Sequence, residues 1–587
     1  MWRYDPPLRD MRFVIDEVLG APAAWAAMPA HAEIDSDMAA AVLEEAGRFA
    51  AEVLAPTNGP GDLEGCTWRD GEVSTPAGYK AAYQAFVDGG WPALACDPDC
   101  GGQGLPELLN AALFEMLVSA NHAWTMYPGL LHGAYEVLHQ HASGWLRETY
   151  LPKVTSGEWL STMCLTEAHA GSDLGLLRTR AVPNAGAADG SYAITGNKIF
   201  ISGGDQDMTP NIVHLVLARL PDAPPGTKGI SLFLVPKWLP DGTRNAARCD
   251  SIEKKMGLKG SATSVMGFDG ATGWLLGEPH RGLQAMFLMM NAARLHVAMQ
   301  GLGHLEAATQ NALRYTAERV QSRSPSRPAG TPAAAADPIV LHPTVRRQLW
   351  TLQAHTESAR VLCYWTAQAL DEEGAHPDEA ARRAAGERAT LLTPVLKALL
   401  TDYGHYGADR ALGLWGGHGY IHEYGIEQLV RDSRIALIYE GTNEIQAIDL
   451  LVRKVLADGG QGLSALLDFV EAELPTTAPT RHAAAARIAT LRAVTKQIVD
   501  AAPQDAQLPY RVADDFLRAC ALVLLDWAWL RIDAALAQAP GSSQAQAPAR
   551  WQAPAQALRQ WVLPEFQMRT YIIVQQCTAA QQAKAHA

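Results

Sequence analysis

The sequence lacks the features that mark several common protein classes. It has only 8 cysteines in 587 residues, and the one close pair, Cys96 and Cys100, has no histidine at ligand spacing. This excludes a disulfide-rich secreted domain and predicts no metal site. The N-terminus has no apolar core of a signal peptide. The most apolar late segment, 516–530, contains Arg518 and Asp526, so it predicts a buried helix and no stable membrane insertion. We expect a cytoplasmic protein.

Positive charge is also scarce. The formal net charge is -14 and the pI is about 5.7, which argues against nucleic acid or an anionic membrane as a main partner. Any anionic ligand must therefore be met by local cations. Hydrophobic residues make up 48% and charged residues 19%, which is typical of globular proteins. The length is sufficient for several domains, each with its own core.

The hydrophobic periodicity changes along the chain and divides it into parts. Apolar residues at helical spacing occupy 35–153. Short β-branched segments bounded by glycine and proline follow, at 192–194, 198–202, 212–220 and 230–235. Helical spacing returns at 284–456 and continues after 462. The order predicts an α domain over 1–160, a β domain over 161–280, an α domain over 281–456 and an additional α domain over 457–587.

One stretch combines features of a helix boundary with a candidate catalytic acid. Residues 438–446 read Ile-Tyr-Glu-Gly-Thr-Asn-Glu-Ile-Gln, and a predicted helix lies on each side. Glu440 is followed by Gly441 and by the cap-forming residues Thr442 and Asn443, which predicts a helix-to-helix corner with a projecting acid. On this pattern alone, the favoured interpretation is that Glu440 is a solvated loop acid.

Five motifs together resemble the signatures of the acyl-CoA dehydrogenase family. They are Cys-Leu-Thr-Glu-Ala-His-Ala-Gly-Ser-Asp at 164–173, Lys-Ile-Phe-Ile-Ser-Gly-Gly at 198–204, Lys-Met-Gly-Leu-Lys-Gly-Ser at 255–261, Gly-Gly-His-Gly-Tyr at 416–420 and Tyr-Glu-Gly-Thr at 439–442. Each is weak alone, but their order is that of the family, over roughly 95–456. The resemblance implies a multidomain α+β fold: an N-terminal α-helical domain, a middle β-barrel or sandwich domain and a C-terminal four-helix-bundle domain, here with an extra C-terminal α-helical domain.

The resemblance also implies the chemistry. FAD would be the cofactor and an acyl-CoA thioester the substrate, with electron-transferring flavoprotein as electron acceptor. Glu440 would remove the α-proton while the β-hydride passes to flavin N5, giving a trans-2-enoyl-CoA, and Arg294 would be its electrostatic partner. Some relatives place the base immediately before this arginine, where this sequence has Ala293, so Glu440 is the only candidate. A carboxylate buried against apolar groups is a better base than one in water.

The remaining site residues are carried over in the same way. Hydroxyls and backbone amides can supply the donors that a flavin edge requires. The implied FAD contacts are Leu165, Thr166, Ser172, Phe200, Ser202, Arg319, Gly416, Gly417, Thr442 and Glu444. The implied substrate contacts are Ser172, Tyr127, Tyr439 and Gly441.

Two positions bear on assembly. Arg319 corresponds to a family arginine that reaches the FAD of a neighbouring subunit, which implies a homodimer or tetramer. The family usually has a glutamine three residues before the Gly-Gly pair, where this sequence has Gly413. Glycine has no side chain for this contact, which puts FAD affinity or the subunit contact in doubt.

Several alternatives remain for the substrate and the reaction. The length, the N-terminal segment and the extra C-terminal domain resemble the large bacterial branch of the family that includes 3-methylmercaptopropionyl-CoA dehydrogenases. Tyr127 beside Pro128 could close an acyl channel early and favour a short acyl group, and methionine suits a thioether tail. Alternatively, Tyr127 is core packing. A long-chain dehydrogenase, an acyl-CoA oxidase using O2 and a non-catalytic scaffold relative are the other hypotheses.

Overall fold

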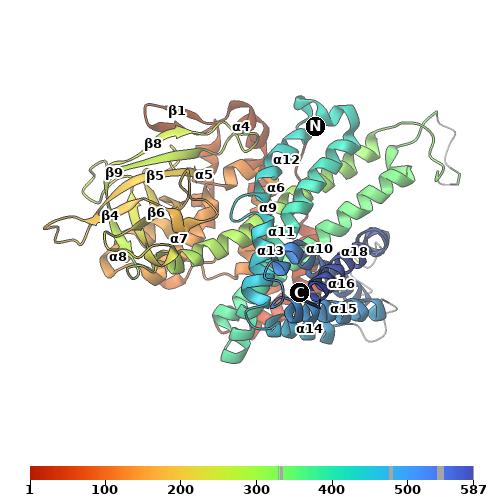
Figure 1. The fold of residues 1–587 in the computed structure, drawn as a ribbon. Helices are drawn as coiled ribbons and strands as arrows, with labels where there is room; N and C mark the ends of the chain where they lie inside the picture. The colour runs from red at the N-terminus through yellow and green to blue at the C-terminus, as the bar shows by residue number, and fades with distance from the viewer. Residues whose placement is uncertain (328, 331–334, 475–479, 539–547, 586–587) are drawn as a thin grey trace. The chain divides into compact units, whose positions relative to one another are not determined.

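The computed structural model describes the whole chain except residues 328, 331–334, 475–479, 539–547 and 586–587. The described chain divides into two compact units. Unit one contains residues 1–47, 106–119 and 297–587, and unit two contains residues 48–105 and 120–296. The predicted boundaries after residues 160, 280 and 456 remain predictions. The order of elements is nevertheless the predicted one, with helices, then a sheet, then helices (Figure 1).

The part of the chain before the sheet is mainly helical. Its helices and its one hairpin are α1 (Leu8–Phe13), α2 (Ala21–Ala26), α3 (Ser36–Arg48), α4 (Asn58–Glu64), β1 (Thr67–Arg69), β2 (Glu72–Ser74), α5 (Tyr79–Asp88), α6 (Glu107–Thr125), α7 (Leu131–His141) and α8 (Gly144–Thr155). Helix α6 is kinked at Asn121, whose backbone is not helical. There the Asn121 side chain accepts a hydrogen bond of 3.0 Å from the backbone N–H of Trp124, which begins the last turn again.

Unit two contains a closed β barrel, whose strands are seen at the left of Figure 1. Its strands are β3 (Leu160–Cys164), β4 (Arg180–Pro183), β5 (Tyr192–Ser202), β6 (Ile212–Arg219), β7 (Ile230–Pro236), β8 (Ala247–Ile252) and β9 (Thr263–Leu276). The ring runs β6-β4-β5-β9-β7 and back to β6, while β3 extends it beside β6 and β8 pairs with β9. Strand β7 is buried along its whole length, and its sequence is apolar except for Ser231.

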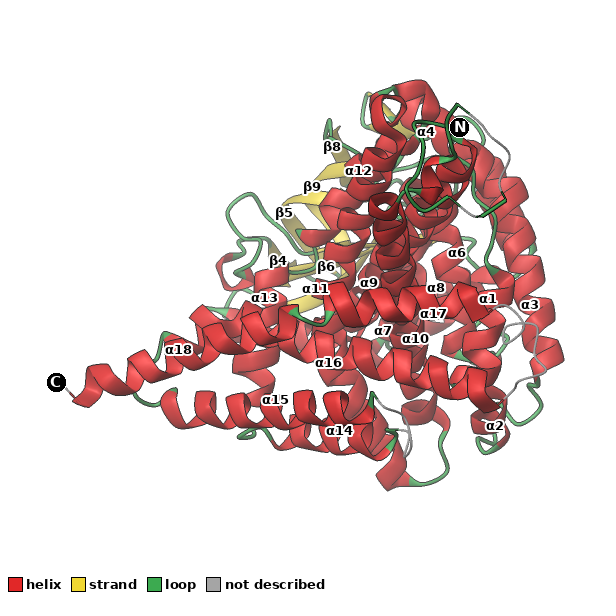
Figure 2. Cartoon of the chain, turned by 90° about the vertical axis from the view of Figure 1, so that its right-hand side faces the viewer, coloured by secondary structure: helices red, strands yellow, loops and turns green. Residues whose placement is uncertain are grey.

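Unit one is helical. It contains the later part of α9 (Gly282–Glu318), and all of α10 (Pro343–Ala375), α11 (Glu379–Trp415), α12 (Ile426–Ser433), α13 (Asn443–Ile448), α14 (Gln461–Ala472), α15 (Arg481–Ala501), α16 (Leu508–Gln538), α17 (Pro548–Ala557) and α18 (Glu565–Ala585). Helices α14, α15, α16 and α18 lie side by side (Figures 1 and 2). The segment 516–530, predicted as a buried helix, is the buried centre of α16, which packs against α10, α11 and α13.

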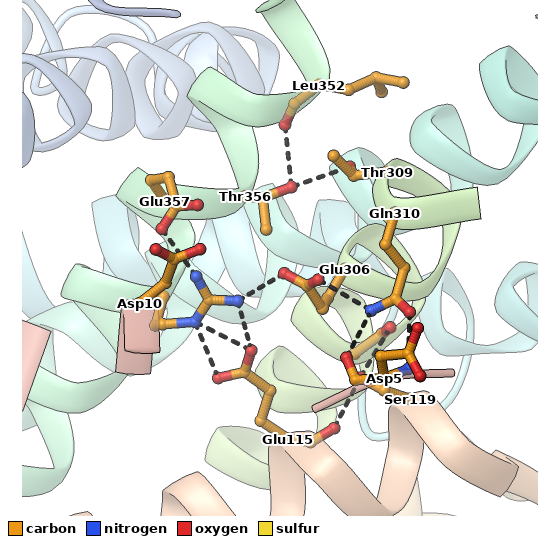
Figure 3. Close-up of polar contacts among 12 residues, drawn as sticks. Asp5, Asp10, Glu115, Ser119, Glu306, Thr309, Gln310, Leu352, Thr356 and Glu357 are labelled. Atoms are coloured by element: carbon orange, nitrogen blue, oxygen red, sulfur yellow. Dashed lines mark hydrogen bonds and ion pairs between the residues drawn. The ribbon is translucent and has the colours of Figure 1, made fainter. Parts of the chain in front are cut away.

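Unit one contains a buried ionic cluster. The Arg360 guanidinium, with no exposed surface, contacts Glu115 at 2.8 Å, Glu357 at 2.7 Å and Glu306 at 2.5 Å. Burial alone would lower the pKa of Arg360, but the three carboxylates hold it well above its usual value. Figure 3 shows the three glutamates converging from separate helices. The cluster therefore joins α6, α9 and α10 through charges that water does not screen.

Two further observations concern the described chain as a whole. None of its helices is long and apolar enough to cross a membrane. All 8 cysteines fall within it, and none of them forms a disulfide.

Candidate active site

The corner around Glu440 is the best-defined part of the candidate site. Helix α12 is followed by a 3₁₀ turn at Arg434–Leu437, and α13 begins at Asn443. Thr442 is the N-cap of α13, and its side chain accepts a hydrogen bond from the Ile445 N–H at 3.4 Å. The predicted helix-to-helix corner is therefore present. Glu440 is in the left-handed region with φ of 54°, and Gly441 follows with φ of 87°.

Two buried side chains hold this left-handed turn. The Lys397 ammonium on α11 donates to the Gly441 carbonyl at 2.7 Å, and the Gln446 amide donates to the Glu440 carbonyl at 2.9 Å. Both side chains come from residues with 0% exposure. A left-handed non-glycine residue costs about 1–3 kcal/mol and persists only where its surroundings impose it. The contacts thus fix the backbone from which the Glu440 carboxylate projects.

The flanking residues of the corner are also fixed. The Tyr439 hydroxyl donates to the Gln300 side chain on α9, and burial together with the neighbouring Glu440 raises the pKa of Tyr439. Glu444 is exposed, and a hydrogen bond from Thr442 lowers the pKa of its carboxyl. The corner therefore presents two acids in different settings, of which Glu440 occupies the constrained backbone position.

In unit two, the first two motifs lie side by side at the end of the barrel. The Ile199 N–H donates to the Thr166 carbonyl at 2.9 Å, so the Leu165–Thr166 turn is bonded to β5. Thr166 and Ser202 are both half-buried. The pairing of β5 with β9 shifts register between Lys198 and Ile201, and Phe200 within that bulge has φ of 60° and is 60% exposed. Bulges of this kind redirect side chains beside active sites.

A buried ion pair between Lys198 and Glu167 holds the Leu165–Thr166 segment. The Lys198 ammonium donates to the Leu165 carbonyl and to Glu167 Oε1, both at 2.9 Å. Burial alone would raise the pKa of Glu167, but Lys198, the Thr179 hydroxyl and two backbone N–H groups lower it to about 2. The pair therefore fixes the backbone of Leu165 in its present orientation.

The other implied residues differ in exposure, and their roles remain predictions. In unit two, Ser172 is exposed in a loop and Arg294 is half-buried on α9. In unit one, Arg319 is exposed immediately after α9, and Gly416 and Gly417 are exposed where α11 ends. A side chain at Gly413 would have open space around its Cβ.

Tyr127 has a packing role. It is 2% exposed, and its hydroxyl donates to the Gly260 carbonyl at 3.2 Å and accepts from the Ala262 N–H at 2.9 Å. Its ring lies 3.1 Å from where a Cβ on Gly203 would be. These contacts are those of the packing alternative, and a role of Tyr127 in closing an acyl channel remains a prediction.

The donor set fits a flavin cofactor. The exposed aromatic ring of Phe200 on a bulged strand offers an apolar face to a flavin, and the hydroxyls of Thr166 and Ser202 offer polar atoms to a flavin edge.

Sequence reasoning missed the residues that support the site. Lys198 belongs to a family motif, but nothing in the sequence indicates its buried ion pair, and Lys397 and Gln446 carry no local signal of their role.

Comparisons with known proteins agree with this geometry. Profiles of the acyl-CoA dehydrogenase N-terminal, middle and C-terminal domains match residues 36–158, 162–271 and 280–455. The chain belongs to the acyl-CoA dehydrogenase family. It is an FAD-dependent oxidoreductase that dehydrogenates an acyl-CoA thioester.

Individual relatives lie in the same family. The 3-methylmercaptopropionyl-CoA dehydrogenase of Ruegeria pomeroyi is 42% identical over 89% of this chain and 90% of its own length. The broad-specificity linear acyl-CoA dehydrogenase FadE5 of Mycobacterium tuberculosis is 36% identical over 79% of this chain and 77% of its own. Among solved structures, an acyl-CoA dehydrogenase of Bacillus anthracis complexed with FAD has a TM-score of 0.71 at 19% identity, covering 95% of this chain and 91% of that one. The last similarity concerns the fold alone.

Proposed function

We propose that Glu440 is the base that removes the α-proton of the acyl-CoA substrate. The observation that carries this proposal is the left-handed turn at Glu440 and Gly441, held by Lys397 and Gln446. Such strain is found where a side chain must be aimed. The backbone N–H of Glu440 would donate to the thioester oxygen and stabilise the negative charge that develops there.

The other candidate site residues have supporting roles in this proposal. Arg294 stabilises charge near the base, and Tyr439 and Gly441 contact the thioester end of the substrate. When bound, FAD supplies the acceptor for the β-hydride. Leu165, Thr166 and Ser202 hold the edge of the ring, Phe200 packs on its face, and Ser172 contacts the ligand beside it. Arg319, Gly416, Gly417, Thr442 and Glu444 hold the rest of the cofactor.

The base assignment is tested by Glu440→Gln, which keeps size and hydrogen bonding but removes basicity. The variant is expected to bind FAD and acyl-CoA but not to reduce the flavin. A variant that reduces flavin at a near-normal rate would refute the assignment.

For the substrate we propose a short acyl-CoA or 3-methylmercaptopropionyl-CoA. The 3-methylmercaptopropionyl-CoA dehydrogenase of R. pomeroyi supports this choice, because its alignment with this chain covers 90% of its length. Each buried methylene is worth roughly 0.8 kcal/mol, so a long acyl pocket would give a kcat/KM that climbs steadily with chain length. A climb to palmitoyl-CoA with weak activity on butanoyl- and 3-methylmercaptopropionyl-CoA would contradict the proposal.

We further propose electron-transferring flavoprotein as the acceptor, a homodimer as the active unit and the cytoplasm as the location. Product held over the reduced flavin would exclude oxygen, so turnover with air alone is expected to be slow. Stoichiometric peroxide at a rate comparable to that with the flavoprotein would instead identify an oxidase. A monomer in sedimentation analysis that retains full activity would exclude the dimer.

A further inference from the structure

The helices that follow residue 456, here called the C-terminal extension, contact the same elements that hold the catalytic corner. Helix α16 packs against α11, which carries Lys397, and against α13, which begins three residues after Glu440. The family profiles end at residue 455, so α16 and α18 lie outside the matched domains. Contact between helices alone would show only packing.

A polar chain of contacts makes the connection specific. Arg518 on α16 is held by Glu565 on α18, with Nε to Oε1 at 3.0 Å, and its Nη1 lies 3.6 Å from Oδ2 of Asp402 on α11. The guanidinium also lies over the Tyr403 ring, 5.0 Å from the centroid. Three contacts therefore fix Arg518 against α11 and α18.

From Asp402 the chain of contacts reaches the corner itself. Asp402 Oδ1 accepts from the Asn443 amide at 2.9 Å, and the Asn443 side-chain oxygen accepts from Lys397 at 3.0 Å. The same Lys397 ammonium donates to the Gly441 carbonyl at 2.7 Å. Each link is a side chain whose orientation the previous one restricts, from the extension to the residue next to Glu440.

We propose that Arg518 is a positioning residue for the catalytic turn, so that the C-terminal extension forms part of the active site's support. This inference rests on Glu440 being the base. Without Arg518, Asp402 loses its cation and holds the Asn443 amide less firmly, which leaves the hydrogen bond from that amide to the Ala398 carbonyl at 3.1 Å. The Lys397 contact with Gly441 then loosens. The left-handed backbone at Glu440, which persists only where its surroundings impose it, then relaxes and moves the carboxylate.

The test compares two arginines of the same helix in the full-length, FAD-loaded protein. Arg518→Met removes the proposed link. Arg531→Met is the matched control, because Arg531 pairs with Glu473 at 2.9 Å and lies over Trp527, with no contact to Asp402 or Asn443 among the described contacts. Arg518→Lys keeps the charge and is expected to restore part of the effect. Asp402→Ala removes the acceptor for the Asn443 amide together with the partner of Arg518, and it decides the matter if Arg518→Met does not fold.

Two readouts distinguish positioning from general stability. The rate constant of anaerobic flavin reduction at saturating acyl-CoA should fall by about 10–100-fold in Arg518→Met, with KM and FAD content little changed. Hydrogen exchange of the peptide covering 438–446 should rise in Arg518→Met and Asp402→Ala but not in Arg531→Met. Equal effects of the two arginine variants, or unchanged exchange at 438–446, would overturn the proposal. Glu440→Gln measured in parallel separates the two claims: its normal activity would refute the base, whereas an inactive Glu440→Gln beside a normal Arg518→Met would refute only the role of Arg518.

Discussion

Removing Arg360 should produce one of the largest losses of stability available to a single substitution in unit one. Arg360→Met keeps much of the apolar volume but leaves Glu115, Glu306 and Glu357 without the guanidinium that all three contact. Breaking a buried ion pair by removing one partner costs about 3–5 kcal/mol, because the remaining charge stays desolvated. Arg550 still contacts Glu357, so the loss falls mainly on Glu115 and Glu306.

The expected loss can be measured by thermal unfolding. At roughly 2 °C per kcal/mol for a large domain, Arg360→Met should lower the unfolding temperature by at least about 6 °C. Unfolding is monitored by circular dichroism and by tryptophan fluorescence. The matched control is Arg410→Met, which removes an exposed pair with Asp409 at 2.8 Å and should change little. Unfolding temperatures of the two variants within about 2 °C of each other would refute the view that the cluster holds α6, α9 and α10 together.

Three further predictions concern the site. Gly413→Gln should bind FAD more tightly than wild type in titrations of the apoprotein, because it restores the family's side-chain amide and its Cβ would meet open space. The control is Gly413→Ala, which gains helix propensity worth up to about 1 kcal/mol without an amide. Equal FAD affinities of the two variants would exclude an amide contact. The pKa of Glu167 is lowered to about 2, so its contribution to stability is complete above about pH 4.5 and is lost as the pH falls toward 2. Glu167→Gln should therefore flatten the loss of circular dichroism over that range, and an unchanged slope would contradict the ion pair with Lys198. Gly441→Ala should slow flavin reduction, since its Cβ would lie 2.8 Å from Gln446 Nε2 at a φ of 87°, whereas Gly459→Ala, also at positive φ but with open space, should not; equal rates would argue against a constrained turn.

The sequence predicted the order of helices and strands where periodicity was strong, but not the full barrel. Strands β6 and β7 were expected because they are short, mostly apolar segments, interrupted within by only His214 in β6 and Ser231 in β7. Strand β9 was missed because Gly267, Gly270 and Gly273 interrupt its pattern, and glycine weakens strand propensity. Its partners β5, β7 and β8 supply the hydrogen bonds that override this local preference.

The candidate site shows the same limit. The helix-to-helix corner at Glu440 could be predicted, because glycine and cap-forming residues act locally. The support for that corner could not, since Lys397, Asp402 and Arg518 lie far from it in sequence and reach it only through the packing of α11 and α16. A lysine or an arginine within a helix is usually solvated, and no spacing rule distinguishes these.

The role of Glu440 is tested most directly by anaerobic single-turnover reduction of the bound flavin by acyl-CoA. In Glu440→Gln, the flavin spectrum and acyl-CoA binding should be retained, while the rate constant should fall by about 10²–10⁴-fold or more, the contribution of a general base. The control Glu423→Gln changes an exposed acid of the same unit and should reduce at the wild-type rate. Flavin reduction in Glu440→Gln as fast as in Glu423→Gln would show that another group removes the proton.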